Sequence, residues 1–249
     1  MIHKNTFNAY QYDDLKNREQ DPYANTKYAL LLKYLEKKRN GKLNILNAGC
    51  GSGDLSILLA QAGHKVLGID PSDEYIDLAK LRASQNGVSC EFKVASIEEL
   101  DYAKYDCVIA TDVLEHIKDD YTAMKKLYDS TKEKGLIIIT VPALQSLFGY
   151  HDEQLGHFRR YNKRNLKKLV LSPGGLKLDL MRYFGFTLIP ICYLFSCLLR
   201  KSYPIGNNKK SLRGSIQDMV LNIMLRIDSL VPMPLGTSLI CLVERNNAR

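Results

Sequence analysis

The sequence lacks several patterns that would assign it to common protein classes. Its cysteines stand at positions 50, 90, 107, 192, 197 and 241, without the close pairs typical of zinc sites or disulfide frameworks. The first residues contain no apolar segment of the signal-peptide kind, and no internal repeat or low-complexity tract is present. These absences predict a protein of a reducing compartment, with a cytoplasmic location and no bound metal.

The length and composition set the size of the expected fold. A chain of 249 residues with 45% hydrophobic residues can fill the core of one α/β domain and still carry an insertion. Apolar strand-like runs alternate with segments of helical spacing along the first two thirds of the chain. This alternation is typical of a parallel sheet that is covered by helices on both faces.

A glycine-rich turn follows the first predicted strand. Residues 43–48 form a short apolar run, a helix is predicted over 54–62, and three glycines stand between them: Gly49, Gly51 and Gly53. Glycine is needed where a ligand approaches the backbone so closely that a Cβ would collide. A second strand delivers Asp70 at its carboxyl end, where an acid accepts hydrogen bonds from a ribose diol. The pattern predicts a nucleoside site. The alternative is a glycine turn that merely closes a strand–helix junction.

The spacing of the glycines bears on the identity of the nucleoside. Dinucleotide folds carry a third glycine within the helix, and this chain has Asp54 at that position. A carboxylate there would repel a pyrophosphate but would tolerate a cationic ligand. No Gly-Lys-Ser/Thr of the phosphate-binding Walker pattern follows the turn either.

Three segments of the sequence resemble the successive motifs of a known family. Residues Ala48–Gly53, Gly68–Ser72 and Tyr105–His116 are similar, in content and order, to those of class I S-adenosylmethionine-dependent methyltransferases. The resemblance covers residues 40–185 and a last strand near 237–244. It implies a doubly wound, seven-stranded, mostly parallel Rossmann-like sheet, with S-adenosyl-L-methionine as cofactor and S-adenosyl-L-homocysteine as product.

The resemblance also implies which residues hold the cofactor. Gly49, Cys50 and Gly51 would line its methionine and ribose portions, and Asp70, followed by Pro71, would hold the ribose hydroxyls. Ser96 and Ile97 would flank the adenine, while Thr111, Asp112 and Val113 would wall the methionine side. His116 follows in the same turn, either as part of this site or as a helix-start residue without a ligand.

The predicted elements divide the chain into four parts. Helices are expected at about 25–38, 54–62, 73–86 and 117–132, and strands at about 43–48, 64–69, 89–94, 106–110, 135–141, 177–181 and 238–243. Residues 1–40 would form an N-terminal flap and helix, with Phe7, Tyr10, Tyr12 and Tyr23 closing over the cofactor or packing on the core. Residues 41–185 would form the cofactor-binding core, 186–236 an inserted helical segment, and 237–249 the last core strand and a tail.

The insertion combines apolar and basic character. Residues 183–199 are strongly apolar and contain Pro190, and the basic residues Arg200 and Lys201 follow them directly. Between Arg159 and Arg226, fourteen lysines and arginines face only two acids. The run is somewhat short for a membrane span of about 20 residues. It indicates an interfacial helix or lid at an anionic membrane surface, or else an ordinary buried helix with a solvated basic edge.

A loop rich in titratable residues follows the fifth predicted strand, where ligand sites of such sheets lie. It gathers His151, Asp152, Glu153, His157, Arg159, Arg160 and Tyr161. The pattern resembles that of a bacterial subgroup of these methyltransferases associated with surface-polysaccharide and glycolipid assembly.

This loop supplies the candidate catalytic and substrate residues. A hydroxyl acceptor must lose its proton, so His157 or His151 is the candidate base, with Asp152 fixing its tautomer. The alternative is that both histidines only shape the loop or orient the substrate. Arg159 and Arg160, beside Tyr161, would clamp a phosphate or carboxylate of the acceptor, or would pair with Glu153 or Asp152.

The sequence thus predicts O-methylation of a glycolipid, a polysaccharide precursor or a lipid-linked small molecule, by an enzyme that is cytoplasmic or peripheral at the inner face of the membrane. The alternatives are a quinone-pathway O-methyltransferase, an RNA methyltransferase, and a non-catalytic partner protein that kept the cofactor fold. RNA is disfavoured, since no Asn-Pro-Pro-Tyr-like motif or appended RNA-binding module is present.

Overall fold

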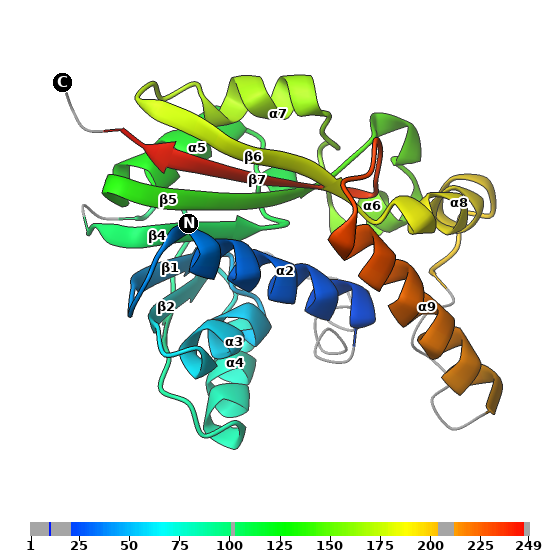
Figure 1. Cartoon of the computed structure of the whole chain (residues 1–249), viewed down its shortest axis with the longest axis horizontal. Helices are drawn as coiled ribbons and strands as arrows, with labels where there is room; N and C mark the ends of the chain where they lie inside the picture. The colour runs from blue at the N-terminus through cyan, green and yellow to red at the C-terminus, as the bar shows by residue number, and fades with distance from the viewer. Residues whose placement is uncertain (1–9, 11–20, 101–102, 204–211, 247–249) are drawn as a thin grey trace.

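A seven-stranded sheet forms the centre of the molecule (Figure 1). The computed structural model describes residue 10 and residues 21–100, 103–203 and 212–246, and within 212–218 only the backbone. The strand order is β3-β2-β1-β4-β5-β7-β6. The pairs β5–β7 and β6–β7 are antiparallel and the other neighbours are parallel, which confirms the predicted doubly wound, mostly parallel sheet.

The strands and helices alternate along the chain as expected. The strands are β1 (Asn44–Ala48), β2 (Lys65–Asp70), β3 (Glu91–Val94), β4 (Tyr105–Thr111), β5 (Thr131–Pro142), β6 (Leu176–Phe184) and β7 (Ser238–Arg245). The helices that flank them are α2 (Pro22–Lys38), α3 (Asp54–Gln61), α4 (Asp73–Gln85), α5 (Asp120–Asp129), α6 (Tyr150–Leu155) and α7 (Lys163–Val170). Short 3₁₀ turns occur at η2 (Leu114–His116) and η3 (Gln145–Leu147).

Each face of the sheet packs on its own set of helices. In β5, Ile137 and Ile139 join the core formed with α5 and α7, whereas Leu136 and Ile138 join the core formed with α2 and α3. This division follows from the two-residue period of a strand, which sends successive side chains to opposite faces. The continuous apolar run of β5 therefore reflects burial on both faces.

The order of the strands places a ligand site at one edge. The chain runs outward from β1 through β2 to β3, and then returns to β4 on the other side of β1. Ligands of open α/β sheets bind outside the carboxyl ends of the strands where the order reverses in this way. The turns after β1 and β4, together with the ends of β2 and β5, therefore surround the expected site.

One predicted boundary differs substantially from the structure. The helix expected over 117–132 is limited to Asp120–Asp129, and β5 begins at Thr131 rather than at 135. The Asp119 side chain caps the helix start by accepting from the Thr122 amide. At its other end, Thr131 already pairs with Tyr105 of β4, and a register shift in the β4–β5 pairing follows. A local interruption of this kind has no periodic signature in the sequence.

The insertion between β6 and β7 is helical but broken. It contains η4 (Phe186–Leu188), α8 (Ile189–Cys192), the π-type turn η5 (Tyr193–Leu198) and α9 (Leu212–Leu230). Pro190 lies in the first turn of α8, where the absence of an amide hydrogen costs nothing. The longest of these helices, α9, packs against α2 through Leu221 and Leu225. No helix among the described residues is both long and apolar enough to span a bilayer.

Of the aromatic residues in the predicted flap, Phe7 and Tyr12 lie outside the described residues. Tyr23, in the first turn of α2, donates its hydroxyl to Ser238 Oγ at 2.7 Å and packs on Phe184. This aromatic residue is therefore part of the core next to β6 and β7.

Candidate active site

The glycine turn after β1 is built for close approach. Gly49, Gly51 and Gly53 all have positive φ angles, of 71°, 50° and 84°. A Cβ added to Gly49 would lie 2.4 Å from Val113 Cγ2, so the turn and the segment after β4 form one tightly packed wall. Left-handed backbone and this lack of space together explain why glycine stands there.

Asp70 ends β2 beside this turn. One carboxylate oxygen accepts the Gly51 amide at 2.9 Å, and the other accepts the Ser72 amide at 3.0 Å. Burial raises the pKa of Asp70, while the two amide hydrogen bonds partly oppose this shift. The carboxylate keeps further lone pairs for hydroxyl donors, so its position fits the predicted contact with a ribose.

The remaining predicted cofactor residues surround these two features. Cys50 is buried, and its amide donates to Ile69 O in β2. Pro71 is exposed directly after Asp70. Ile97 is buried in the core, and the amide of neighbouring Ser96 donates to Glu99. The structure thus brings these residues to the ends of β1, β2 and β3.

A buried ion pair that the sequence did not predict lies at the end of β4. Asp112, with φ 55°, binds the ammonium of Lys27 in α2 and accepts from Thr140 Oγ1 at 3.0 Å. Burial opposes the charged form of Lys27, but Asp112 raises the Lys27 pKa above its usual value. Lys27 shares the buried face of its helix with Ala24, Leu31 and Leu35, and a lysine on an apolar stripe is the signal that could have found it.

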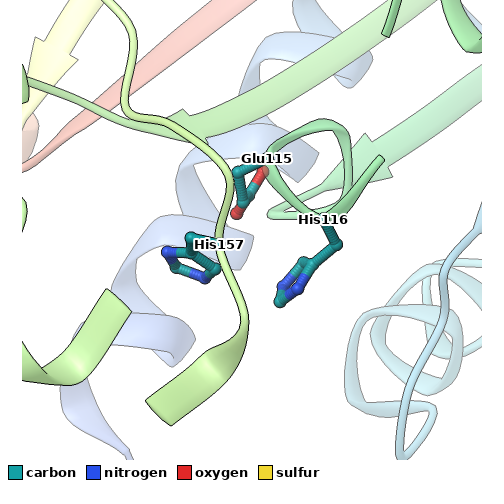
Figure 2. Close-up of side chains that lie close together, drawn as sticks. All are labelled: Glu115, His116 and His157. Carbon is teal, nitrogen blue, oxygen red and sulfur yellow. The ribbon is translucent and has the colours of Figure 1, made fainter. Parts of the chain in front are cut away.

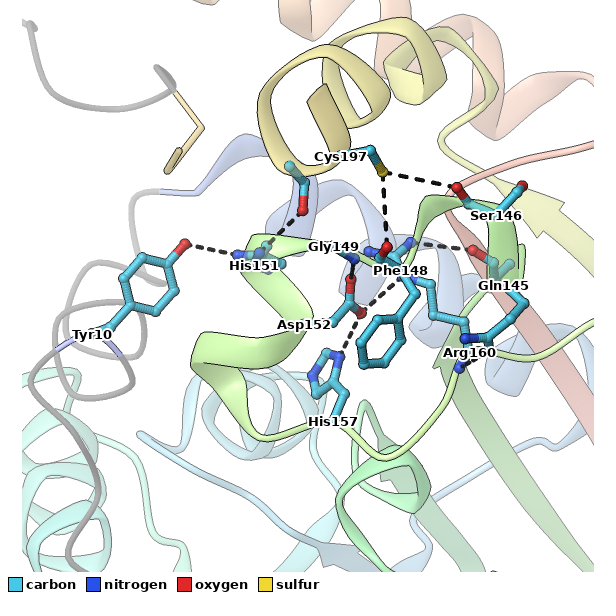
Figure 3. Close-up of polar contacts among 12 residues, drawn as sticks. Tyr10, Gln145, Ser146, Phe148, Gly149, His151, Asp152, His157, Arg160 and Cys197 are labelled. Carbon is cyan, nitrogen blue, oxygen red and sulfur yellow. Dashed lines mark hydrogen bonds and ion pairs between the residues drawn. The ribbon is translucent and has the colours of Figure 1, made fainter. Parts of the chain in front are cut away.

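The loop after β5 contains a histidine held by a carboxylate (Figure 3). His157 Nδ1 lies 2.8 Å from Asp152 Oδ1, and Arg160 Nε donates to the same oxygen at 2.8 Å. Burial would raise the pKa of Asp152, but the hydrogen bond from His157 and the charge of Arg160 lower it to about 2. Asp152 therefore stays ionised and fixes the orientation of the imidazole.

His151, the other candidate base, has different partners. Its Nδ1 is 2.8 Å from the Tyr10 hydroxyl, and its ring lies against that of Tyr203. Its amide donates to Ser196 Oγ in the insertion. Figure 3 shows it on the side of α6 that faces Tyr10, whereas His157 lies on the far side of Asp152. The histidine that the structure pairs with Asp152 is His157.

The predicted substrate residues are positioned unequally. Arg160 is buried and also donates to Ala143 O, and buried Tyr161 donates its hydroxyl to Asp120 at 2.8 Å. Both are thus held in the interior in this structure, because each satisfies a buried polar partner there. Arg159 is partly exposed and pairs with Asp120 at 2.9 Å, so a substrate contact stays a prediction mainly for this arginine.

Two further side chains face His157 from the loop after β4 (Figure 2). The His116 ring meets the His157 ring edge-on, with 4.6 Å between centroids. Glu115 is fully buried, and within the described part of the chain neither of its carboxylate oxygens has a hydrogen-bond partner. Burial, reinforced by the nearby charge of Asp112, raises the pKa of Glu115 well above its usual value. Sequence reasoning assigned no role to Glu115.

The arrangement defines a class of protein: a Rossmann-like sheet whose switch-point edge carries a glycine turn, a buried acid at the end of β2 and a histidine-containing loop. The family model described as a methyltransferase domain matches residues 39–182. The chain therefore belongs to the methyltransferase-domain family, and its fold is that of class I S-adenosylmethionine-dependent methyltransferases, as predicted.

Curated relatives resemble part of the chain. A putative methyltransferase of Geobacillus sp. (strain WCH70) is 29% identical over 162 residues, which cover 60% of this chain and 65% of that protein. The ubiquinone biosynthesis O-methyltransferase of Bradyrhizobium diazoefficiens is 34% identical over 101 residues, 40% of each chain. The similarity thus spans between two fifths and about two thirds of these relatives.

Solved structures resemble nearly the whole chain. The magnesium protoporphyrin IX methyltransferase of Synechocystis PCC 6803 with bound S-adenosyl-L-homocysteine has a TM-score of 0.63, at 18% identity over 96% of both chains. The plantazolicin methyltransferase BpumL, also in complex with S-adenosyl-L-homocysteine, has a TM-score of 0.63 at 14% identity, covering 98% of this chain and 92% of its own. At these identities the likeness defines the fold.

Proposed function

We propose that this protein transfers the methyl group of S-adenosyl-L-methionine to a hydroxyl oxygen of a lipid-linked or otherwise apolar acceptor. The observation that carries the proposal is the His157–Asp152 pair, which lies at the same edge of the sheet as the glycine turn and Asp70. Val113 contacts the turn, and His116, three residues later, contacts His157. These contacts support the assignment of the cofactor residues and the histidine to one continuous site.

The division of chemistry follows from this layout. The cofactor supplies an electrophilic methyl group, and the protein has to align the acceptor oxygen with it. As the new C–O bond forms, the oxygen must also lose its proton. With Nδ1–H donated to Asp152, the Nε2 of His157 is the free acceptor of the ring, which makes His157 the candidate base.

The exposed surface of the insertion supports an apolar acceptor. Of the sixteen large apolar side chains exposed among the described residues, twelve lie between residues 186 and 235. In α9, Met219, Ile223, Ile227 and Leu230 follow one another at helical spacing and are 57%, 54%, 46% and 67% exposed. We call these four residues the α9 stripe. Such a stripe on a helix opposite its packed face is suited to an interface.

Basic residues accompany the apolar ones. Arg226 is exposed within α9, and Lys201 is exposed just after η5, where Leu198 is 61% exposed. Cationic and apolar groups together complement an anionic lipid surface. The η5 segment also contacts the active-site loop, since Cys197 lies 3.8 Å from Ser146 O. We infer that the insertion docks on an anionic membrane and receives acceptors from it.

A quinone precursor is a second candidate acceptor. Several relatives with 29–42% identity carry the name ubiquinone biosynthesis O-methyltransferase. The shared segments cover less than half of this chain, from 31% to 45%. This similarity supports the same type of reaction on an aromatic hydroxyl with an apolar tail, and it makes such a phenol the natural comparison for a glycolipid or polysaccharide precursor.

The test is product identification. The purified protein is incubated with labelled S-adenosyl-L-methionine and, separately, with lipid, sugar-precursor, quinone-precursor and RNA fractions, using Gly49→Ala as the inactive control. We expect label in an alkali-stable ether of a lipid-soluble product. Label on nitrogen, on carbon or in RNA alone would overturn the proposed acceptor.

A further inference from the structure

The carboxylate of Glu115 is fully buried. Neither of its oxygens has a hydrogen-bond partner among the described residues. An ionised carboxylate in such a place costs several kcal/mol unless a cation or donors compensate it. Asp112, three residues earlier, adds negative charge beside Glu115, and the charge of Lys27 opposes this only in part. A positive charge next to Glu115 would compensate this carboxylate.

Two imidazoles complete a ligand set around this carboxylate. One ligand atom each from Glu115, His116 and His157 lies within 4.8 Å of the others. Figure 2 shows the three side chains converging from two segments, with Glu115 and His116 from η2 and His157 from the loop after α6. The ligands are scattered over 43 positions of the chain, which is why no metal-like spacing was visible in the sequence.

The surroundings of His157 match those of a metal-binding histidine. Such a ligand typically donates its second ring N–H to a carboxylate, which fixes its orientation and makes it more basic. Here Nδ1 is paired with Asp152 at 2.8 Å, and Arg160 holds the same carboxylate. In the tautomer that donates from Nδ1, Nε2 is the nitrogen with a lone pair for a cation, and the His157 ring lies against that of His116.

We propose that Glu115, His116 and His157 bind a divalent transition-metal ion of the Zn²⁺ class. Two imidazoles and one carboxylate suit such an ion better than Mg²⁺ or Ca²⁺, which prefer all-oxygen sets. Three protein ligands also leave a coordination position open, as in catalytic zinc sites. The sequence-based expectation of no metal is replaced by this proposal.

The proposal deepens the proposed function and, in its mechanistic part, rests on it. At the open position the cation binds the acceptor oxygen and lowers the pKa of its hydroxyl, so that the proton passes to water. The alkoxide then forms its C–O bond to the methyl carbon as the C–S bond breaks, and sulfur keeps the electron pair. In the metal-loaded enzyme His157 is a ligand rather than a base, since each role uses Nε2.

The binding test uses the full-length protein, stripped with a chelator and titrated with Co²⁺ as a spectroscopic probe. We expect one equivalent to bind with the visible absorption of a four- or five-coordinate site, and Zn²⁺ to displace it. Glu115→Gln and His157→Gln each keep the side-chain size and should abolish this signal. Asp152→Asn should weaken binding about 10- to 100-fold, because it alters only the group behind the ligand.

Two controls keep the result interpretable. His151→Gln removes a histidine of the same loop that lies outside the cluster, and it should leave the Co²⁺ signal unchanged. Binding of S-adenosyl-L-homocysteine and the thermal midpoint show whether each variant is folded. Absence of the signal from the wild-type protein, or its persistence in folded Glu115→Gln and His157→Gln, would overturn the site.

The experiments distinguish failure of the metal site from failure of the proposed function. Full methyl transfer by the stripped protein, combined with no Co²⁺ signal, would refute the metal site and leave the proposed function standing. A Co²⁺ signal that depends on Glu115 and His157, without methylation of any hydroxyl acceptor, would support the site and refute the function. Loss of activity on stripping that Zn²⁺ restores would support both.

Discussion

At the scale of single residues, the candidate site contains some residues that the sequence could locate and others that it could not. Gly49 and Asp70 could be located from the sequence because turn geometry restricts them to one residue type and one position in the chain. Lys27 and Glu115 could not, since each acquires its role only when segments far apart in sequence meet. The choice between His151 and His157 as the candidate base likewise could not be made from the sequence, because it depends on the contact with Asp152.

Replacing Gly49 by alanine should abolish cofactor binding. The new Cβ would lie 2.4 Å from Val113 Cγ2, in a backbone conformation with φ 71°. Gly63→Ala is the matched control, because φ is 91° there and no atom lies within 4 Å of the added Cβ. The left-handed backbone should cost both variants about 1–2 kcal/mol of stability, and the clash with Val113 should cost Gly49→Ala more. Only Gly49→Ala should lose affinity in calorimetry. Equal affinity in the two variants would refute the assigned contact.

Replacing Lys27 by methionine should destabilise the fold markedly. The Lys27 side chain is 3% exposed and that of its partner Asp112 is 20% exposed, so the change leaves a mostly buried carboxylate without its cation. Removing one partner of a buried pair costs on the order of 3 kcal/mol, which urea unfolding measures. The control is Lys33→Met, an exposed position of the same helix, where we expect a change within about 0.5 kcal/mol. A similar small change for Lys27→Met would contradict the pairing.

At the scale of elements, strands were predicted better than helix ends and the insertion. The strands of the parallel core are buried on both faces and stand out as apolar runs, such as residues 136–139. The end of α5 depends on a register shift between β4 and β5, which leaves no pattern in the sequence. The apolar run 183–199 also turned out to be divided between β6, η4, α8 and η5 rather than forming one helix.

The insertion should bind anionic vesicles through the α9 stripe. In co-sedimentation at low salt, the wild-type protein should pellet with phosphatidylglycerol vesicles and remain in solution with phosphatidylcholine. Ile223→Glu should reduce the bound fraction several-fold, since it puts a like charge and a polar group into the interface. Leu81→Glu is the control, because Leu81 is 55% exposed but lies on α4.

Two results would count against this docking surface. Equal pelleting of Ile223→Glu and the wild-type protein would show that the α9 stripe does not face the lipid. A concentration-dependent dimer that Ile223→Glu dissociates, without any vesicle binding, would assign the stripe to contact with a second copy of the chain.

At the scale of the whole molecule, the fold was predictable because independent signals agree. Alternating elements, the glycine turn, the acid after β2 and the ordered motifs all indicate the same sheet, which the strand order and the family match confirm. The acceptor was not predictable in this way. It depends on the insertion and on the loop after β5, which contact each other although they lie far apart in the sequence.

The central claim is that the edge of the sheet between the glycine turn and Asp70 binds S-adenosyl-L-methionine. Isothermal titration calorimetry of the full-length protein tests it most directly. We predict saturable binding of S-adenosyl-L-methionine and S-adenosyl-L-homocysteine near one equivalent, with clear weakening in Asp70→Asn and no heat from a nicotinamide dinucleotide. Folded protein that binds the dinucleotide but neither sulfur compound would contradict the account.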